Sequence, residues 1–264
     1  MSANRSTDPS TDSIVHSGDD LTEAEFLARY DAGAYERPSV TVDMAVFTIR
    51  EGRLAVLLVL RGGHPFRGRW ALPGGFIGPD ESAEVAAGRE LAEECGGELA
   101  ARAHLEALDH YTDPDRDPRT RVISLAYVAF VPDAPDPTAG DDAAAARFWI
   151  LDDLVGPEAP ELAFDHDLIL ADAVERVRSR IEYTTLAATF LDEPFTIAEL
   201  RRIYEAIWGV TLDPANFHRK VRNSDGFVIA AEGRATPTLG RPAALYRRGP
   251  ASTMHPPILR PDPT

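Results

Sequence analysis

Three glutamates, Glu90, Glu93 and Glu94, are spaced at i, i+3 and i+4, so a helix would bring their carboxylates to one face. Like charges at this spacing destabilise a bare helix by roughly 0.2–0.5 kcal/mol per pair, whereas a bound cation reverses the effect. Mg²⁺, or Mn²⁺ in its place, suits such a face because hard cations bind carboxylates together with phosphate oxygens. Arg89 is expected to hold a neighbouring glutamate, with Glu93 as its i+4 partner. The pattern predicts a metal site, and a solvated acidic helix is the alternative.

The residues that precede the glutamates favour the metal site. Gly74 and Gly75 permit a tight turn and a close approach of the backbone to a ligand or metal. Glu81 is expected to open the helix and adds a fourth carboxylate. Metal ions at such a site neutralise a diphosphate, lower the pKa of a bound water and orient it for attack. We therefore expect pyrophosphate chemistry, with Glu93, Glu94 and Arg89 as the catalytic residues.

The complete spacing decides between the two interpretations. Gly75 is followed after five residues by Glu81, after seven more by Arg89-Glu90-Leu91, and then by Glu93-Glu94 and Gly96. This pattern resembles the Nudix box at every charged position, and only Gly97 departs, where the family prefers an aliphatic residue. The resemblance implies an α/β/α sandwich and a metal held by Glu90, Glu93, Glu94 and the Gly75 carbonyl. Asp141 and Asp142 are candidates for one further carboxylate, unless they are a solvated loop pair.

The pattern of elements fits an α/β domain up to about residue 182. A short helix is expected at 21–30, a hairpin with its turn at Glu51-Gly52, and a strand at 122–131. Apolar residues at helical spacing predict a helix over 165–180. Mixed strands and helices of this kind are typical of a single α/β fold.

The chain then changes character. Thr196 and Glu199 form a capping box for one helix, and Asp213-Pro214 is an N-cap followed by proline at the first position of another. With a preceding helical segment at 184–191 and two strands at 227–231 and 243–247, the order is that of a winged helix-turn-helix. Its second capped helix and its wing offer groups that read bases or hold phosphates. The DNA-binding candidates are Asn216, His218, Arg219, Lys220, Arg222 and Arg241. A small domain used for protein contacts is the alternative.

The loop after the predicted box offers ligand-binding groups. Arg116 and Arg119 could meet phosphates or ribose, and Tyr111 could stack on a base, although a surface turn with ordinary charge pairing is equally compatible. The proline and aromatic residues of this loop resemble the ADP-ribose branch of the Nudix family.

A wider resemblance covers nearly the whole chain. Glu36-Arg-Pro-Ser-Val40, Leu162-Ala-Phe-Asp-His166, Asn216-Phe-His-Arg-Lys220 and Gly240-Arg-Pro-Ala243 are similar to the Nudix-related transcriptional regulators of NAD metabolism. The resemblance implies a domain that senses ADP-ribose or a related nucleotide, and a winged helix that binds operator DNA as a homodimer. Because the box is undamaged, we expect hydrolase activity to be retained. Two alternatives stay open: an ADP-ribose pyrophosphatase whose C-terminal domain only dimerises, and a sugar-responsive repressor.

Charge and composition agree with two domains. The net charge of −16 argues against nucleic-acid binding over the whole surface, but residues 1–183 carry −18 and residues 184–264 carry +2. We expect a disordered tail at 1–20, a Nudix domain at 21–182, a winged helix at 183–250 and a flexible tail at 251–264. No segment is typical of a signal peptide or a transmembrane helix, and a single cysteine, Cys95, suits a cytoplasmic protein.

Overall fold

The computed structural model describes residues 22–132, 134–137, 143–234 and 243–261. The chain divides into two compact units, Met1–Arg37 and Pro38–Thr264. The first contains α1 (Glu23–Arg29), which begins at a capping box between Thr22 and Glu25, and the 3₁₀-helix η1 (Ala32–Ala34). The predicted short helix at 21–30 is therefore present, whereas the expected tail at 1–20 lies outside the described residues.

Seven strands within the described part of the second unit form one mixed sheet. At its centre β1 (Ser39–Arg50) pairs antiparallel with β2 (Arg53–Arg61) and parallel with β6 (Val122–Phe130). The strand β5 (His104–Tyr111) pairs with β6, and β7 (Ala143–Ile150) pairs with β2. The short strands β3 (Trp70–Ala71) and β4 (Gly74–Phe76) pair with β2 and β1. The turn between β1 and β2 lies at Glu51-Gly52, as predicted, with both residues at positive φ.

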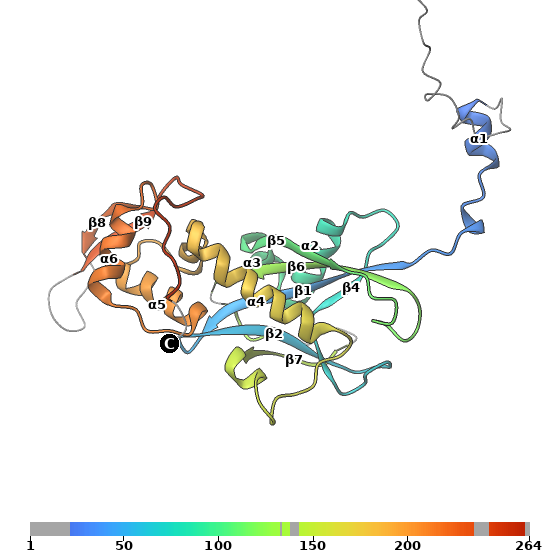
Figure 1. Ribbon diagram of the computed structural model, residues 1–264, viewed down its shortest axis with the longest axis horizontal. Helices are drawn as coiled ribbons and strands as arrows, with labels where there is room; N and C mark the ends of the chain where they lie inside the picture. Colours follow the sequence, from blue (N-terminus) through green and yellow to red (C-terminus); the bar gives the residue numbers. More distant parts are fainter. Residues whose placement is uncertain (1–21, 133, 138–142, 235–242, 262–264) are drawn as a thin grey trace, which may run out of the picture. The chain divides into compact units, whose positions relative to one another are not determined.

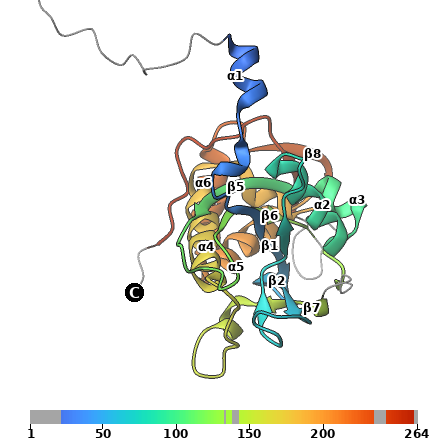
Figure 2. The same ribbon diagram turned by 90° about the vertical axis from the view of Figure 1, so that its right-hand side faces the viewer.

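Helices cover both faces of this sheet (Figures 1 and 2). On one face α2 (Ala83–Cys95) buries Ala87 and Leu91 against Val42 and Met44 of β1, and α3 (Gly97–Arg102) follows it. On the other face α4 (His166–Tyr183) packs its apolar stripe against alternate residues of β1 and β2. Because β1 is covered on both sides, its middle residues, Met44–Phe47, form a continuous apolar run rather than an alternating pattern. The predicted α/β/α sandwich is confirmed.

Two element boundaries differ from the predictions. Ser82, whose hydroxyl accepts a hydrogen bond from the amide of Val85, is the N-cap of α2, so the helix begins at Ala83 and not at Glu81. Glu81 instead accepts a hydrogen bond from the amide of Gly78 in the preceding loop. The segment expected as a helix at 184–191 is a 3₁₀-helix, η3 (Thr185–Phe190), and a second one, η2 (Leu151–Leu154), follows β7.

The C-terminal domain has the predicted helix-helix-hairpin order. Helix α5 (Ile197–Trp208) begins at the Thr196–Glu199 capping box and ends at Gly209, which adopts the left-handed conformation. Helix α6 (Pro214–Asn223) is capped by the Asp213 side chain. Strands β8 (Val228–Arg234) and β9 (Ala244–Arg248) pair antiparallel, and the connection at 235–242 lies outside the described residues. The winged-helix architecture is confirmed.

The last segment corrects a prediction. Residues 251–261 do not form a free tail, because Met254 and Ile258 are buried and their amides donate to the carbonyls of Tyr183 and Glu182. These carbonyls end α4 and have no partner within the helix, so the returning chain satisfies them. Arg260 adds an ion pair with Glu175 of α4 at 2.8 Å. The segment therefore belongs to the folded unit.

In the part of the chain that the structure describes, no helix combines the length and the apolar character needed to cross a bilayer.

Candidate functional site

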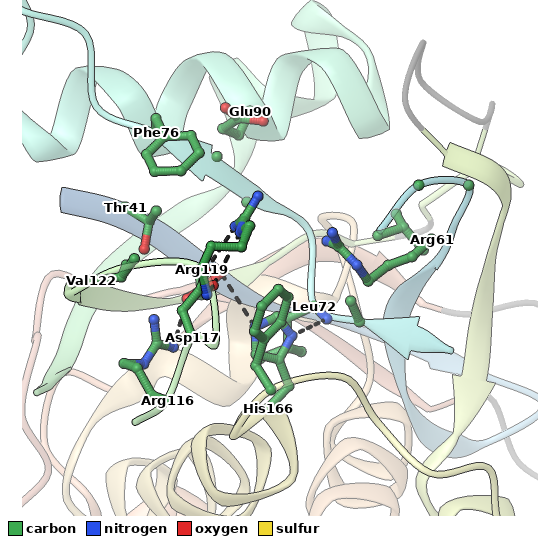
Figure 3. Close-up of a pocket in the computed structure, with 18 of the residues that line it drawn as sticks. Thr41, Arg61, Leu72, Phe76, Glu90, Arg116, Asp117, Arg119, Val122 and His166 are labelled. Atoms are coloured by element: carbon green, nitrogen blue, oxygen red, sulfur yellow. Dashed lines mark hydrogen bonds and ion pairs between the residues drawn. The ribbon is translucent and has the colours of Figure 1, made fainter. Parts of the chain in front are cut away.

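A cavity of about 970 Å³ opens over the carboxyl-terminal part of β2, the β4 strand and the first residue of α4, His166 (Figure 3). Its walls come from β1, the β2–β3 loop, β4, α2, the loop after β5 and the start of α4. A volume near the upper end of the range for small-molecule sites can hold a nucleotide-sized ligand. Of the residues that the sequence predicts for catalysis or metal binding, Gly75, Arg89, Glu90 and Glu93 line this cavity.

Arg89 organises the carboxylates at one end of the cavity. Its guanidinium donates to Glu90 at 2.7 Å and to Glu81 at 2.9 Å, and it reaches Glu93 at 3.5 Å. The predicted contact with Glu93 is therefore the longest of the three, and the main partners are Glu81 and Glu90. The hydrogen bond from Arg89 lowers the pKa of Glu81 below its usual value. Arg89 thus favours the ionised form of Glu81 and orients both Glu81 and Glu90.

Glu90 lies directly against the backbone of Gly75. A Cβ atom built on Gly75 would lie 2.1 Å from a carboxylate oxygen of Glu90, so no side chain fits there. Burial raises the pKa of Glu90, although the hydrogen bond from Arg89 acts in the opposite direction. A half-buried carboxylate beside an accessible backbone is a donor set that suits a hard divalent cation.

For Glu94, the third predicted carboxylate, only the backbone position is described. The backbone of α2 carries Glu94 one residue after Glu93, but the side chain of Glu94 is outside the described ones. Among the side chains that are described, no three carboxylate, imidazole or thiol groups converge closely enough to hold a metal ion. Asp141 and Asp142 also lie outside the described residues.

A buried charge network forms the floor of the cavity. Arg116 donates to Asp165 at 2.7 and 2.9 Å and to Asp43 at 3.3 Å, and Asp43 also accepts from the Ser124 hydroxyl. Only 3% of the Arg116 side chain is exposed. Arg116 lines the cavity, but its guanidinium is paired with the two aspartates, so the ligand contact predicted for it stays a prediction.

Arg119 and Tyr111, the other predicted ligand residues, differ in their positions. The half-exposed Arg119 guanidinium pairs with Asp117 at 2.7 Å and lies between the rings of Phe76 and Phe164, 5.8 and 6.0 Å from their centroids. Figure 3 shows it in the middle of the cavity. Tyr111 does not line the cavity, since its ring is in the core and its hydroxyl donates to Asp172 at 2.8 Å. Stacking of Tyr111 on a base is therefore a prediction that the structure corrects.

Sequence reasoning missed several cavity residues, namely Asp43, Arg61, Phe76, Phe164 and His166. Asp43 had a signal, because a carboxylate within the apolar run of β1 is unusual unless it is paired. Phe164 adopts a positive φ of 56°, and the Arg61 guanidinium carbon lies 4.8 Å from the centroid of its ring. Nothing local in the sequence identifies that conformation.

Five of the six candidate DNA-binding residues lie on α6. Phe217 and Val221 are buried, whereas Asn216, His218, Arg219 and Arg222 are exposed and Lys220 is half-buried. Arg219 donates to the side-chain oxygen of Asn216 at 2.8 Å. The helix therefore presents a polar, basic surface opposite its apolar stripe. Arg241 lies outside the described residues.

Two family models match the chain. A NUDIX domain matches residues 39–173, and an NrtR DNA-binding winged helix domain matches residues 187–248. The chain is 32% identical to the ADPR responsive transcriptional repressor NtrR of Acinetobacter baylyi, over 86% of this chain and 88% of that protein. It is 41% identical to the ADP-ribose pyrophosphatase of Methanocaldococcus jannaschii, over 52% of this chain and 74% of that protein.

Solved structures of NrtR from Shewanella oneidensis agree with these matches. NrtR in complex with a 27mer DNA is 32% identical, with a TM-score of 0.66 over 80% of this chain and 94% of that one. Its NUDIX domain in complex with ADP ribose is 34% identical, with a TM-score of 0.52 over 60% of this chain and 99% of that one. The chain therefore belongs to the Nudix family, and within it to the transcriptional regulators that join a NUDIX domain to an NrtR-type winged helix.

Proposed function

We propose that this protein is a transcriptional regulator that binds ADP-ribose in its Nudix cavity and operator DNA through α6 and the wing. The observation that carries the proposal is the presence, in one chain, of the Gly75–Glu90 carboxylate cradle and an exposed basic helix. The A. baylyi repressor, similar along 86% of this chain, supports this combination of activities. The ADP-ribose complex of the S. oneidensis NUDIX domain supports the choice of ligand.

We further propose that the chain retains Mg²⁺-dependent pyrophosphohydrolase activity, which Mn²⁺ would also support. Glu90, Glu93, Glu94 and the Gly75 carbonyl would hold the metal. When bound, the cation would neutralise the diphosphate and lower the pKa of a water molecule. Arg89 orients Glu90 and Glu81 beside that position and itself lines the cavity. The similarity to an ADP-ribose pyrophosphatase favours this activity.

The remaining contacts follow from the cavity walls. Arg119, whose guanidinium reaches the centre of the cavity, would bind a phosphate or a ribose hydroxyl. Phe76 and Phe164 offer aromatic surface for a base, in the role that Tyr111 is too buried to take. Arg116 acts from beneath, by fixing Asp43 and Asp165.

On DNA, Asn216, His218, Arg219, Lys220, Arg222 and Arg241 would supply the contacts. Asn reads adenine and Arg reads guanine in the major groove, and the other basic groups hold phosphates. Because the rest of the chain is acidic, binding must be focused on this domain and must weaken steeply with salt, since each phosphate contact releases counterions.

A gel-shift experiment tests the regulator. The protein is titrated onto its own upstream region and onto promoters of NAD-biosynthesis genes, with and without ADP-ribose. We expect specific binding that ADP-ribose weakens. Replacing Arg219 by Ala should weaken binding uniformly if the residue meets a phosphate, or by about 1–3 kcal/mol at one base if it makes a bidentate contact. Arg53→Ala, an exposed site on the β1–β2 hairpin, is the control for the change in charge.

The hydrolase is tested separately. Glu93→Gln and Glu94→Gln should abolish Mg²⁺-dependent cleavage of ADP-ribose while the thermal midpoint changes little, and Glu84→Gln on an exposed position of α2 should retain activity. If the wild type cleaves no nucleoside diphosphate derivative, the enzyme proposal fails and the sensor proposal stands. If no genomic fragment binds better than random DNA and Arg219→Ala has no effect, the chain is a pyrophosphatase whose C-terminal domain only dimerises.

A further inference from the structure

His166 joins the cavity to the helix that carries the winged-helix domain. It is the first residue of α4, it is 3% exposed, and it lines the cavity floor. The backbone amide of Leu72 donates to its Nδ1 at 2.8 Å, so the neutral ring carries its proton on Nε2. That nitrogen lies 3.5 Å from a carboxylate oxygen of Asp43. Both ring nitrogens are therefore committed, one to the backbone and one to the buried charge network.

The Leu72 amide belongs to the segment that ends in the Gly75 cradle. Between them, the Pro73 carbonyl accepts from the amide of Met44 at 2.8 Å. Gly74 is pressed against β1, because a Cβ there would lie 2.2 Å from the carbonyl oxygen of Val42. The segment is thus clamped by β1 on one side and by His166 on the other (Figure 3). Its position fixes where the Gly75 backbone meets Glu90.

A second hydrogen bond ties the same two segments. The amide of Ala163 donates to the carbonyl of Trp70 at 2.8 Å. Together with the bond from Leu72 to His166, it joins residues 70–72 to residues 163–166 at two points. A displacement of the cradle therefore reaches the first turn of α4 directly.

The other end of α4 is bonded to the winged helix. The carbonyl of Arg178 accepts from the Trp208 indole at 3.0 Å, and the carbonyl of Ile181 accepts from the Tyr204 hydroxyl at 3.0 Å. The Arg178 guanidinium donates back to the carbonyl of Ile207 at 3.2 Å. One continuous helix thus connects the cavity floor to the core of the DNA-binding domain, as the ribbon in Figure 1 shows.

We propose that His166 is a positioning residue whose Nδ1 bond to Leu72 orients the Gly75 cradle and couples occupation of the cavity to the winged helix through α4. This inference rests on the proposed function and adds the route by which the ligand acts. Coupling requires that ADP-ribose has different affinities for the two positions of the segment, and α4 then carries the difference to DNA.

Two amide replacements separate the roles of the ring nitrogens. His166→Asn places a side-chain oxygen near the position of the His166 Nδ1 atom and so keeps an acceptor for the Leu72 amide. His166→Gln places its amide near the position of the His166 Nε2 atom, toward Asp43, and leaves the Leu72 amide without that acceptor. Both variants put an uncharged amide in the same buried site, so they are matched for polarity.

The first measurement is titration with Mn²⁺, followed by electron paramagnetic resonance. We expect His166→Gln to lose about tenfold in Mn²⁺ affinity, at the lower end of the ~10–100-fold range typical when groups that orient metal ligands are removed. His166→Asn should stay within about threefold of the wild type, because it keeps the bond to Leu72. Equal affinities for the wild type and both variants would overturn the positioning role.

The second measurement is release of the best-bound DNA fragment by ADP-ribose. All three proteins should bind the fragment equally without ligand, and saturating ADP-ribose should weaken binding about tenfold or more in the wild type and His166→Asn. In His166→Gln the effect should shrink to about twofold or less. Val177→Ala, in the buried middle of α4, should keep the full response and controls for loss of stability.

The outcomes of the two measurements distinguish a failure of the role of His166 from a failure of the proposed function. A wild type that does not respond to ADP-ribose contradicts the proposed function, and the Mn²⁺ titration then still decides the positioning role. A wild type that responds while His166→Gln responds equally overturns the coupling through His166 alone.

Discussion

At the scale of single residues, the cavity floor is defined by charges that face each other rather than the solvent. Arg116 is shared by Asp43 and Asp165, and all three are largely removed from water. Removing one partner of a buried pair leaves the others unpaired in a medium of low dielectric, which costs more than the pair contributes. The stability of this floor and the shape of the cavity therefore depend on the same guanidinium.

We expect Arg116→Met to lower the free energy of unfolding by about 3–5 kcal/mol, because two buried carboxylates lose their partner. Urea denaturation measures this change. Arg69→Met is the matched control, since Arg69 pairs with Glu161 on the surface and such pairs contribute about 0–1 kcal/mol. Equal losses in the two variants would mean that Arg116 is not held in the way the structure indicates.

His166 makes the stability of the folded protein depend on pH. Burial lowers the pKa of His166 below its usual value of 6.5, although Asp43 and Asp165 act in the opposite direction. The folded state therefore stays neutral while the unfolded chain binds a proton, so the free energy of unfolding falls as the pH drops below about 6.5. Between about pH 7.5 and 5.5 the wild type should lose more stability in urea than His166→Asn, which cannot bind that proton. A loss as large in the variant would assign the pH dependence to other groups.

At the scale of elements, α4 is the centre of the second unit. Its apolar stripe covers the sheet, its first turn touches the cavity, and its last turn meets both α5 and the returning chain at 251–261. The returning chain is the least expected of these contacts. Met254 packs beside Tyr204, whose hydroxyl lies 3.8 Å from the methionine sulfur. Residues 251–261 thus pack over the contact between α4 and the winged helix.

Shortening the side chain in this segment should therefore destabilise the protein. Met254→Ala is expected to cost about 2–5 kcal/mol, the range for opening a cavity in a packed core. Leu259→Ala, at a half-exposed position five residues further on, should change the free energy of unfolding by less than about 0.5 kcal/mol. Thermal or urea unfolding of the two variants measures the difference. If Met254→Ala does not lower the free energy of unfolding, the segment is the flexible tail that the sequence predicts.

At the scale of the whole molecule, the charge is divided between two functions. The acidic part up to residue 183 contains the metal-binding candidates, and the slightly basic remainder contains the recognition helix. A single short helix with a net charge of +2 around it gives few phosphate contacts. Two copies of the domain on one DNA site would double them.

We therefore expect a homodimer, because winged-helix proteins usually read two-fold sites whose halves lie about one DNA turn, ~34 Å, apart. Multi-angle light scattering at micromolar concentration should give twice the chain mass of 28.8 kDa, with and without ADP-ribose. A mass equal to one chain under both conditions would contradict this prediction.

The sequence alone determined the features that are encoded within a few residues. The helical spacing of Glu90, Glu93 and Glu94 and the capping box of Thr196 and Glu199 each depend on neighbours three or four positions away, where helix geometry determines which side chains meet. For that reason the carboxylate face and the winged-helix order could be predicted from local patterns, whereas the α/β/α sandwich was expected from the resemblance of residues 75–96 to the Nudix box.

Only the tertiary structure decided the floor of the cavity. Arg116 and Arg119 are three residues apart in one charged loop and both line the cavity, yet the Arg116 side chain is buried against Asp43 and Asp165 whereas the Arg119 side chain is half-exposed. The bonds from Tyr111 to Asp172 and from Leu72 to His166 join residues 61 and 94 positions apart. Such pairings leave no periodic trace in the sequence, because they depend on which elements the sheet order brings together and on which polar groups then lose their water. The residues that carry the chemistry of the site are encoded by local sequence patterns, whereas the residues that support them are determined by the tertiary fold.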